Sequence, residues 1–413
     1  MNKICLTQIS INDNNIVGNF EVSGNDEWLS FFKKPYTFQL ECNQNVFTQK
    51  KSVAVIPFVA NVLPIVWLMN ATLELDELDE AFYNCIENVK KGYINMYPEF
   101  SFKGKINVKN IIKNTYSNDN SLVLFSGGVD AFQTLLSHID EKPYLLTLWG
   151  ADVQFDNKNG WSEVKKQIEL TANTFNLKSF TIRTNFRDYI NESVLNTYIN
   201  KIKNGKLWYH DFQHGIAIIS HASLIACQLE IGKVYISSSY TKENKGKITC
   251  ASDPTIDNYI RFGSTGVLHD GYEYNRQDKV KKICEYRNKN KTNIPLRVCW
   301  ESDDGNNCCH CEKCYRTIIS IIAEKENPKD YGFNNFDEKA KKNMIHELRY
   351  KYKIQYKKSK HKYFVYAQER LRQNYTLKEC PKYLKWFYKV RIRDLNPFVF
   401  KVIRFLKKAI HKI

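Results

Sequence analysis

Residues 122–130 read LVLFSGGVD, and the apolar stretch AFQTLLSHI follows directly. This order predicts a buried β-strand that stops at Ser126, a turn made by Gly127 and Gly128, and a helix that starts near Asp130. The two glycines allow the backbone to pass close to a ligand, because no Cβ lies in the way. N–H groups at the start of a helix favour an anion. The stretch therefore predicts a phosphate-binding turn, with an ordinary tight β–α turn as the alternative.

Strands and helices alternate along the chain on both sides of this turn. Strands are predicted at 121–125, 144–149, 179–183 and 233–239, and helices at 161–175, 187–203 and 214–230. Such alternation predicts an α/β fold with a parallel, doubly wound sheet. Ligands of these sheets bind beyond the carboxyl ends of the strands. Ser126, Trp149–Asp152 and Ser237–Tyr240 all fall at such ends, so we expect them to converge on one pocket.

A second motif lies at residues 299–316, which read CWESDDGNNCCHCEKCYR. Four thiolates can close a tetrahedral zinc site, and C-x2-C spacing presents two sulfur atoms to one ion. An iron–sulfur cluster also fits four cysteines, whereas disulfides are disfavoured in a chain without a secretory signal. Cys309 is predicted to lie outside the ligand set, and His310 is an alternative ligand. The predicted zinc ligands are Cys299, Cys308, Cys311 and Cys314.

Together the two motifs resemble one branch of the PP-loop ATP pyrophosphatase family, the branch of 7-cyano-7-deazaguanine synthase and its less-characterised relatives. The glycine turn is similar to the family's SGGxDS signature, except that Ala131 stands where the family has serine. The cysteines are similar to the family's zinc motif, and Asn307–Thr317 to the N-C-G-x-C-E-K-C-x-R-T ending of the relatives. The likeness runs from about Ser121 to Ile322. It implies a PP-loop fold with a zinc knuckle, to which the residue patterns outside this range add an N-terminal α+β module and a basic helical tail.

The resemblance implies a ligase that splits ATP into AMP and pyrophosphate. A substrate carboxylate attacks the α-phosphorus, and ammonia or an amine then displaces AMP to give an amide, or a nitrile if the cycle repeats. The implied cofactors are ATP, Mg2+ and a structural Zn2+; carboxylates near a triphosphate suit magnesium. Ser126 and Asp130 are the expected catalytic residues. The expected ATP-binding residues are Ser126, Gly127, Gly128, Val129, Asp130, Trp149, Gly150 and Asp152.

Two other functions stay open. A tRNA-modifying PP-loop ligase or thiolation enzyme would need a sulfur-carrying cysteine, for which Cys250 is the candidate. An ATP-binding regulatory protein that has lost catalysis is supported by Ala131. Other polar residues are candidates for binding the substrate or pyrophosphate, or for acting as bases: Glu273, Arg276, Lys279, Lys313, Arg316, His210, His214, His221 and His269.

The length of 413 residues is enough for two or three domains. The predicted division is an N-terminal α+β module over 1–115, the PP-loop domain over 116–325 and a basic, partly amphipathic tail over 326–413. Within the first module we expect short strands over the first 60 residues and an amphipathic helix over Leu75–Tyr97, with an extended segment over Phe100–Ile112. Nothing in the sequence indicates an oligomeric state.

The net charge of +17 belongs to the tail, because residues 341–413 hold 22 Lys and Arg but only 4 Asp and Glu. Residues Asn396–Ile413 have the pattern of a basic amphipathic helix. Such a helix suits an anionic membrane surface; basic residues among aromatic ones also suit single-stranded nucleic acid, and a helix docked on the body is the third reading. We expect a cytoplasmic protein, peripheral at the inner membrane face if the first reading holds. Its carboxylate substrate is expected to be large, such as a protein, a nucleic acid or a surface-polysaccharide precursor.

Overall fold

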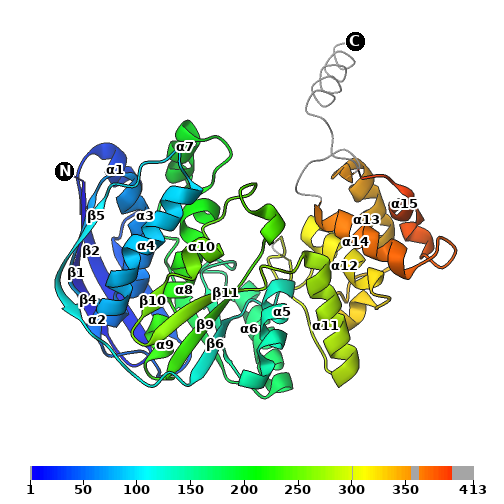
Figure 1. Ribbon diagram of the computed structural model, residues 1–413, viewed down its shortest axis with the longest axis horizontal. Helices are drawn as coiled ribbons and strands as arrows, with labels where there is room; N and C mark the ends of the chain where they lie inside the picture. Colours follow the sequence, from blue (N-terminus) through cyan, green and yellow to red (C-terminus); the bar gives the residue numbers. More distant parts are fainter. Residues whose placement is uncertain (1, 300, 355–361, 393–413) are drawn as a thin grey trace, which may run out of the picture. The chain divides into compact units, whose positions relative to one another are not determined.

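The structure is a computed structural model that describes residues 2–299, 301–354 and 362–392. The chain forms two compact units, Met1–Glu273 and Tyr274–Ile413 (Figure 1). The division into three segments at 115 and 325 stays a prediction. Strands from both sides of residue 115 nevertheless belong to the same sheet of the first unit.

One sheet with eleven described strands forms the frame of the first unit. In chain order the strands are β1 (Lys3–Ile11), β2 (Asn15–Ser23), β3 (Thr37–Cys42), β4 (Thr72–Asp79), β5 (Lys105–Ile112), β6 (Asn120–Leu124), β7 (Tyr144–Trp149), β8 (Ser179–Thr184), β9 (Ile231–Ser237), β10 (Arg261–Phe262) and β11 (Thr265–Asp270). Their order across the sheet is β10-β11-β9-β6-β7-β8-β3-β2-β1-β4-β5. The sheet is mostly parallel, which confirms the predicted α/β class.

The block β11-β9-β6-β7-β8 is parallel throughout. Strands β6, β7, β8 and β9 are mostly buried, as expected for strands covered on both faces, whereas β11 alternates between buried and more exposed residues. Read from β8 to β11, the block has the order third, second, first, fourth, fifth strand. The chain thus starts in the middle, moves to one side and then crosses to the other. Strand order reverses between β6 and β9, and ligands of doubly wound sheets bind at such a reversal.

Helices of this block are α5 (Val129–Ser137), α6 (Lys158–Phe175), α7 (Glu192–Ile202), α8 (His214–Ser220), α9 (Ser223–Ala226) and α10 (Pro254–Asp257). The helix predicted over 187–203 begins only at Glu192, because Tyr189 and Ile190 are buried and pair with the first module instead: the Asn61 amide donates to the Tyr189 hydroxyl and Ile190 forms a bridge with Phe32. The helix predicted over 214–230 is broken after Ser220 into α8 and α9.

Two predictions in the first module are confirmed only in part. The expected helix over Leu75–Tyr97 is α4 (Glu80–Met96), and the residues before it belong to β4. Asp79 separates the two elements, because its Oδ1 accepts a hydrogen bond from the N–H of Phe82 at 2.9 Å and caps the helix. Strands were expected through residue 60, but α2 (Lys51–Ala54) and α3 (Ile56–Leu68) occupy that region. Helix α3 is apolar on all sides and almost completely buried, so it lacks the polar face that identifies a helix.

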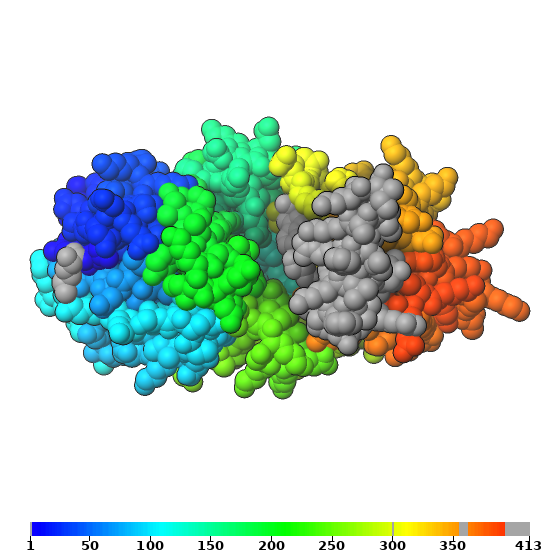
Figure 2. Space-filling model, turned by 90° about the horizontal axis from the view of Figure 1, so that it is seen from above, coloured from blue at the N-terminus to red at the C-terminus, as the bar shows by residue number. Residues whose placement is uncertain are grey.

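The first module is continuous with the parallel block. Strand β3 joins it by antiparallel pairing with β8, and α1 (Asp26–Ser30) lies near α7. The rings of Phe31 and Tyr198 lie 5.4 Å apart, and Figure 2 shows the blue N-terminal segment beside the green segment around residue 200. Trp67 of α3 packs against Tyr93 of α4 at 5.6 Å. This packing joins the first module and alternate residues of the parallel strands in one hydrophobic cluster.

The second unit is helical where it is described. Its helices are α11 (Arg276–Asn290), α12 (Glu312–Ala323), α13 (Glu338–Tyr350), α14 (Lys362–Asn374) and α15 (Lys385–Lys389). Arg370 of α14 forms a bidentate pair with Glu324, with N–O distances of 2.9–3.1 Å. The predicted helix over Asn396–Ile413 lies outside the described residues. Among the described residues, no helix combines the length and the apolar character needed to cross a membrane.

Candidate functional site

The glycine turn follows β6 as predicted. Phe125 remains in the sheet, since its N–H donates to the carbonyl of Leu146 at 2.8 Å. Ser126 is exposed, and Gly127 has φ +75°, a conformation that favours glycine. Gly128 is the N-cap of α5 with an extended backbone and makes no side-chain cap. No N-cap side chain therefore accepts a hydrogen bond from the N–H groups of the first turn of α5.

The start of α5 is fixed by its apolar side. Val129, Ala131 and Phe132 are buried in the core, whereas Asp130 is half-buried in the first turn. The methyl group of Ala131 thus packs inside the molecule. The side chain at position 131 therefore belongs to the buried side of α5, and the backbone donors of the turn do not depend on it.

The end of β7 carries the second group of predicted residues. The ring of Trp149 stacks on Trp161 at 5.1 Å with an interplanar angle of 8°, and the Arg183 guanidinium lies 4.6 Å from its centroid. Gly150 has φ +116°, and a Cβ at this position would collide with the carbonyl oxygen of Thr184. Asp152 is exposed. Trp149 and Gly150 therefore shape the loop, and Asp152 is the side chain that the loop presents.

Parallel pairing brings the predicted groups to one edge of the sheet. Strand β6 lies between β9 and β7, so the turn after β6 is flanked by the residues that follow the other two strands. Trp149–Asp152 follow β7, and Ser238–Tyr240 follow β9. The sequence correctly predicted this shared edge from the alternation of elements.

A cluster that sequence analysis did not assemble lies at this edge: Tyr209, His210, His214, Cys250 and Asp257. Tyr209 and His210 lie in a short π-helical turn, η2 (Tyr209–Gln213), that runs directly into α8. The imidazole Nε2 of His210 lies 2.9 Å from the hydroxyl of Tyr240, and its Nδ1 lies 3.4 Å from Asp211. Both histidines lie close enough to the Cys250 thiol to stabilise its thiolate. The only sequence signal was the density of polar residues in YHDFQHG.

The segment His269–Gly271 has structural contacts. His269 Nδ1 and Asp257 Oδ2 are 2.8 Å apart and fully buried. Asp270 accepts a hydrogen bond from the Thr134 hydroxyl at 2.8 Å and lies 3.2 Å from His138, so it ties β11 to α5. A Cβ on Gly271 would collide with the side chain of Gln133. These residues hold the helix that follows the glycine turn.

His221 is a buried neutral residue, which yields a prediction about pH. Its Nδ1 donates to the carbonyl of Ala217 at 2.7 Å, so its Nε2 accepts from the Thr184 hydroxyl at 3.0 Å. Burial lowers the pKa of His221 from 6.5 to about 4. Between these two values the unfolded chain binds a proton that the folded chain does not, so stability falls as the pH falls from 6.5 to 4.

The expected loss is about 3 kcal/mol over this window, at about 1.4 kcal/mol for each pKa unit. Denaturant unfolding at a series of pH values should show it for the wild type. In a His221→Gln variant, whose amide can donate and accept hydrogen bonds but does not titrate, this part of the pH dependence should disappear. Equal pH profiles for the two proteins would contradict the assignment.

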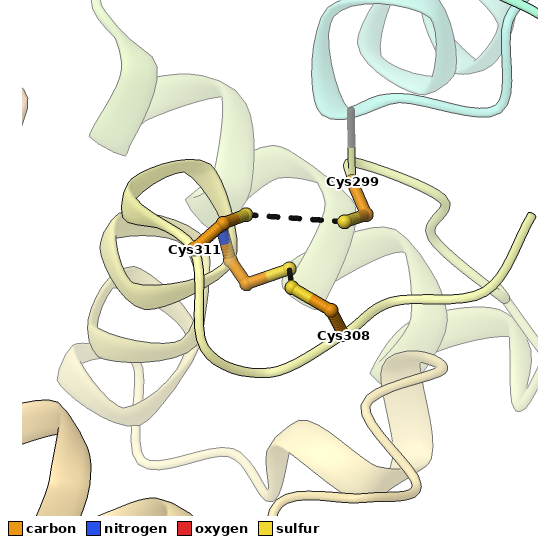
Figure 3. A group of neighbouring side chains, drawn as sticks. Cys299, Cys308 and Cys311 are labelled. Carbon is orange, nitrogen blue, oxygen red and sulfur yellow. Dashed lines mark hydrogen bonds between the residues drawn. The ribbon is translucent and has the colours of Figure 1, made fainter. Parts of the chain in front are cut away.

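In the second unit the structure brings the four predicted cysteines together. The sulfur atoms of Cys299, Cys308, Cys311 and Cys314 all lie within 4.8 Å of one another. The sulfur atoms of Cys299 and Cys311 are 3.9 Å apart (Figure 3). Those of Cys308 and Cys314 are also 3.9 Å apart. Tetrahedral zinc with Zn–S bonds of about 2.3 Å separates its sulfur ligands by about 3.8 Å. The four cysteines therefore fit a metal ion such as zinc.

Local hydrogen bonds position these sulfur atoms. Cys311 is the N-cap of α12, and its Sγ accepts from the N–H of Cys314 at 3.3 Å. Asn307 is buried; its Oδ1 accepts from the N–H groups of Val298 and Cys299, and its Nδ2 donates to the carbonyls of Leu296 and Gly332. Asn307 thus joins the distant Cys299 to the loop that carries the other three cysteines.

Cys309 and His310 do not belong to this group. The Cys309 thiol is buried against the carbonyl of Asn307, and burial raises its pKa to about 12. His310 is exposed. By contrast, the four clustered thiols hydrogen-bond to one another, which lowers the pKa of Cys299 and raises the pKa of Cys311 and of Cys314. For Cys308, Cys299 raises the pKa, but Cys311 and Cys314 outweigh it and lower that pKa to about 6. A bound cation would favour the thiolate form of all four.

Several further candidates have contacts within the second unit. Arg276 is buried and donates to Thr317, and Lys279 is also buried. Arg316 lies 3.6 Å from Glu312 and 4.4 Å from the Tyr363 ring centroid. These contacts hold α11, α12 and α14 together. They do not bear on the prediction that these residues bind substrate or phosphate.

The described residues form an α/β protein with a large, mostly parallel sheet, a glycine turn at its strand-order reversal and a cysteine cluster that could bind a metal. Comparison of the chain with protein-family models, curated proteins and solved structures gave no match.

Proposed function

We propose that this chain is a PP-loop-type ATP-dependent ligase that adenylates a carboxylate and releases pyrophosphate. The observation that carries the proposal is the position of the Ser-Gly-Gly turn. It joins the first strand of the parallel block to α5, next to the point where strand order reverses. This is where doubly wound proteins bind nucleotides, and a helix N-terminus behind a glycine turn suits a phosphate. No Walker lysine follows the turn.

In the proposed reaction, the glycine turn binds the leaving group, pyrophosphate. A carboxylate oxygen attacks the α-phosphorus of ATP, and the bond between the α-phosphorus and the bridging oxygen breaks. Main-chain N–H groups at the start of α5 and the Ser126 hydroxyl stabilise the charge that develops on pyrophosphate. Asp130 and Asp152 are the carboxylates at this edge that could hold Mg2+. The acyl-adenylate then reacts with ammonia or an amine to give an amide.

The cysteine cluster has a structural role in this proposal. Four thiolate ligands leave zinc no open position for substrate or water. Zinc would hold Cys299 against the loop that precedes α12 and so stabilise the second unit.

Pyrophosphate exchange is the experiment that tests the proposal. The chain is incubated with ATP, Mg2+, labelled pyrophosphate and pools of carboxylic acids. Label should enter ATP only with the pool that contains the substrate, because adenylation is reversible before the amine reacts. An Asp130→Ala variant should lose exchange, and a Glu21→Ala variant on the exposed part of β2 should keep it. Exchange that does not depend on any carboxylate would contradict the proposed reaction.

A further inference from the structure

The cluster around Cys250 contains buried polar atoms that do not pair with one another. Cys250 is 7 % exposed. Among the described residues, the Tyr209 hydroxyl, His214 Nδ1 and Asp257 Oδ1 are buried and have no hydrogen-bond partner. Asp257 is completely buried and lies close enough to His214 to influence its charge. Since buried polar atoms are nearly always paired, this group has the character of a binding site for a polar ligand.

The two histidines make the Cys250 thiol reactive. Burial alone would raise the pKa of Cys250, but His210 and His214 outweigh it and lower that pKa to about 7. In return, Asp211 and Cys250 raise the pKa of His210 to about 10. For the buried Cys85, burial outweighs the nearby Arg261 and raises the pKa to about 12. A thiolate beside an imidazolium is the arrangement of nucleophilic cysteines.

The position of the cluster relates it to the glycine turn. Tyr240, which contacts His210, follows β9, and Asp152, which influences the charge of Tyr209 and His214, follows β7. Strand β6 lies between β9 and β7 and ends in the Ser-Gly-Gly turn. The thiol and the turn are therefore at the same edge of the sheet.

We propose that Cys250 is a catalytic nucleophile that receives the acyl group of the adenylate as a thioester before the amine does. This step rests on the proposed adenylation. The Cys250 sulfur forms a bond to the acyl carbon, and the bond from that carbon to the AMP oxygen breaks with its electron pair on AMP. The amine nitrogen then attacks the same carbon, the C–S bond breaks, and the thiolate is restored. Once the sulfur is acylated, no thiolate favours the protonated form of His214, so His214 releases its proton to solvent; as the neutral imidazole it then accepts the proton that the amine loses.

Acyl transfer to Cys250 is testable without ATP. The full chain is mixed with p-nitrophenyl acetate, which carries an activated acyl group, and p-nitrophenolate release and the acetylated peptide are followed. We expect a burst of about one equivalent, as for an acyl-enzyme, with the acetyl group on Cys250 and removable by hydroxylamine. His214→Gln should slow the burst at neutral pH by about tenfold or more, because less thiolate is present. Cys85→Ser, at another buried cysteine, should leave it unchanged.

The pH dependence gives a readout that a structural role would not produce. The burst rate should rise with a midpoint near 7 in the wild type, and the midpoint should move upward in His214→Gln. The titratable groups that interact with Cys250 are His210, His214, Tyr93, Tyr97 and Tyr209. Asp211 acts on His210, and Asp152 and Asp257 act on His214.

Three results would overturn the proposal: no acetyl group on Cys250 of the wild type, an undiminished burst in Cys250→Ser, or a persulfide on Cys250 that transfers its outer sulfur. The last would assign sulfur transfer instead. Because the assay contains no ATP, its failure is distinct from failure of adenylation. If AMP and pyrophosphate form but Cys250 is not reactive, the remaining mechanism is direct attack of the amine on the adenylate.

Discussion

Cys311→Ser is expected to abolish stoichiometric zinc binding and to unfold the second unit. Cys311 supplies one of the four sulfur atoms and also caps α12 through its contact with the N–H of Cys314. Structural zinc contributes on the order of 10 kcal/mol to the folding free energy of small units. We therefore expect the free energy of unfolding of the second unit to fall by more than about 5 kcal/mol in this variant. Metal content by mass spectrometry and helicity by circular dichroism measure the two effects.

Cys309→Ser is the matched control. It also replaces a cysteine sulfur by oxygen in the same loop, but the Cys309 sulfur lies against Asn307 and outside the four-sulfur group. This variant should still bind one zinc ion per chain. Its free energy of unfolding should fall by about 1 kcal/mol, because the new hydroxyl is buried. Zinc binding by Cys311→Ser with unchanged helicity would refute the metal centre. Zinc loss in both variants would place Cys309 among the ligands.

Gly127→Val should lower the affinity for ATP and Mg2+ by at least about 100-fold, or about 3 kcal/mol. Gly127 has φ +75°, which a β-branched residue strongly disfavours. The turn would have to change conformation, and the N–H groups at the start of α5 would no longer point at one phosphate. Titration calorimetry with ATP and Mg2+ measures the affinity directly.

Gly205→Val controls for strain in this experiment. Gly205 has φ +86°, and a Cβ there would meet no atom within 4 Å. The free energy of unfolding should therefore fall by a similar amount in both variants, about 1–2 kcal/mol. Only Gly127→Val should lose affinity for ATP. Equal affinity in Gly127→Val and wild type would show that the turn does not bind the nucleotide.

Local patterns predicted much of the parallel block and the cysteine cluster. The strand predicted at 144–149 matches β7 at both ends, because buried apolar runs between turn residues are a local signal. The four cysteines could be assigned from spacing, since C-x2-C geometry is local and only Cys299 had to be added from a distance. The contribution of Asn307, which fixes that distance, is visible only in the folded chain.

The misassigned parts depend on contacts between distant residues. Helix α3 has no polar face because β4 and the helices α4 and α8 surround it. Strand β3 joins β8 across more than 130 residues, and no local pattern reports such pairing. The Cys250 cluster needs a π-helical turn to bring Tyr209 and His210 beside His214. A π-helical turn is rare and has no reliable sequence pattern.

The bond of ATP that is broken tests the central claim most directly. The protein is incubated with Mg2+ and ATP labelled either at the α- or at the γ-phosphate, together with the carboxylate found by pyrophosphate exchange and with ammonia. The account predicts that the α-label appears in AMP and the γ-label in pyrophosphate, in equal amounts, and that Gly127→Val forms neither. An α-label in ADP and a γ-label in inorganic phosphate would contradict adenylation.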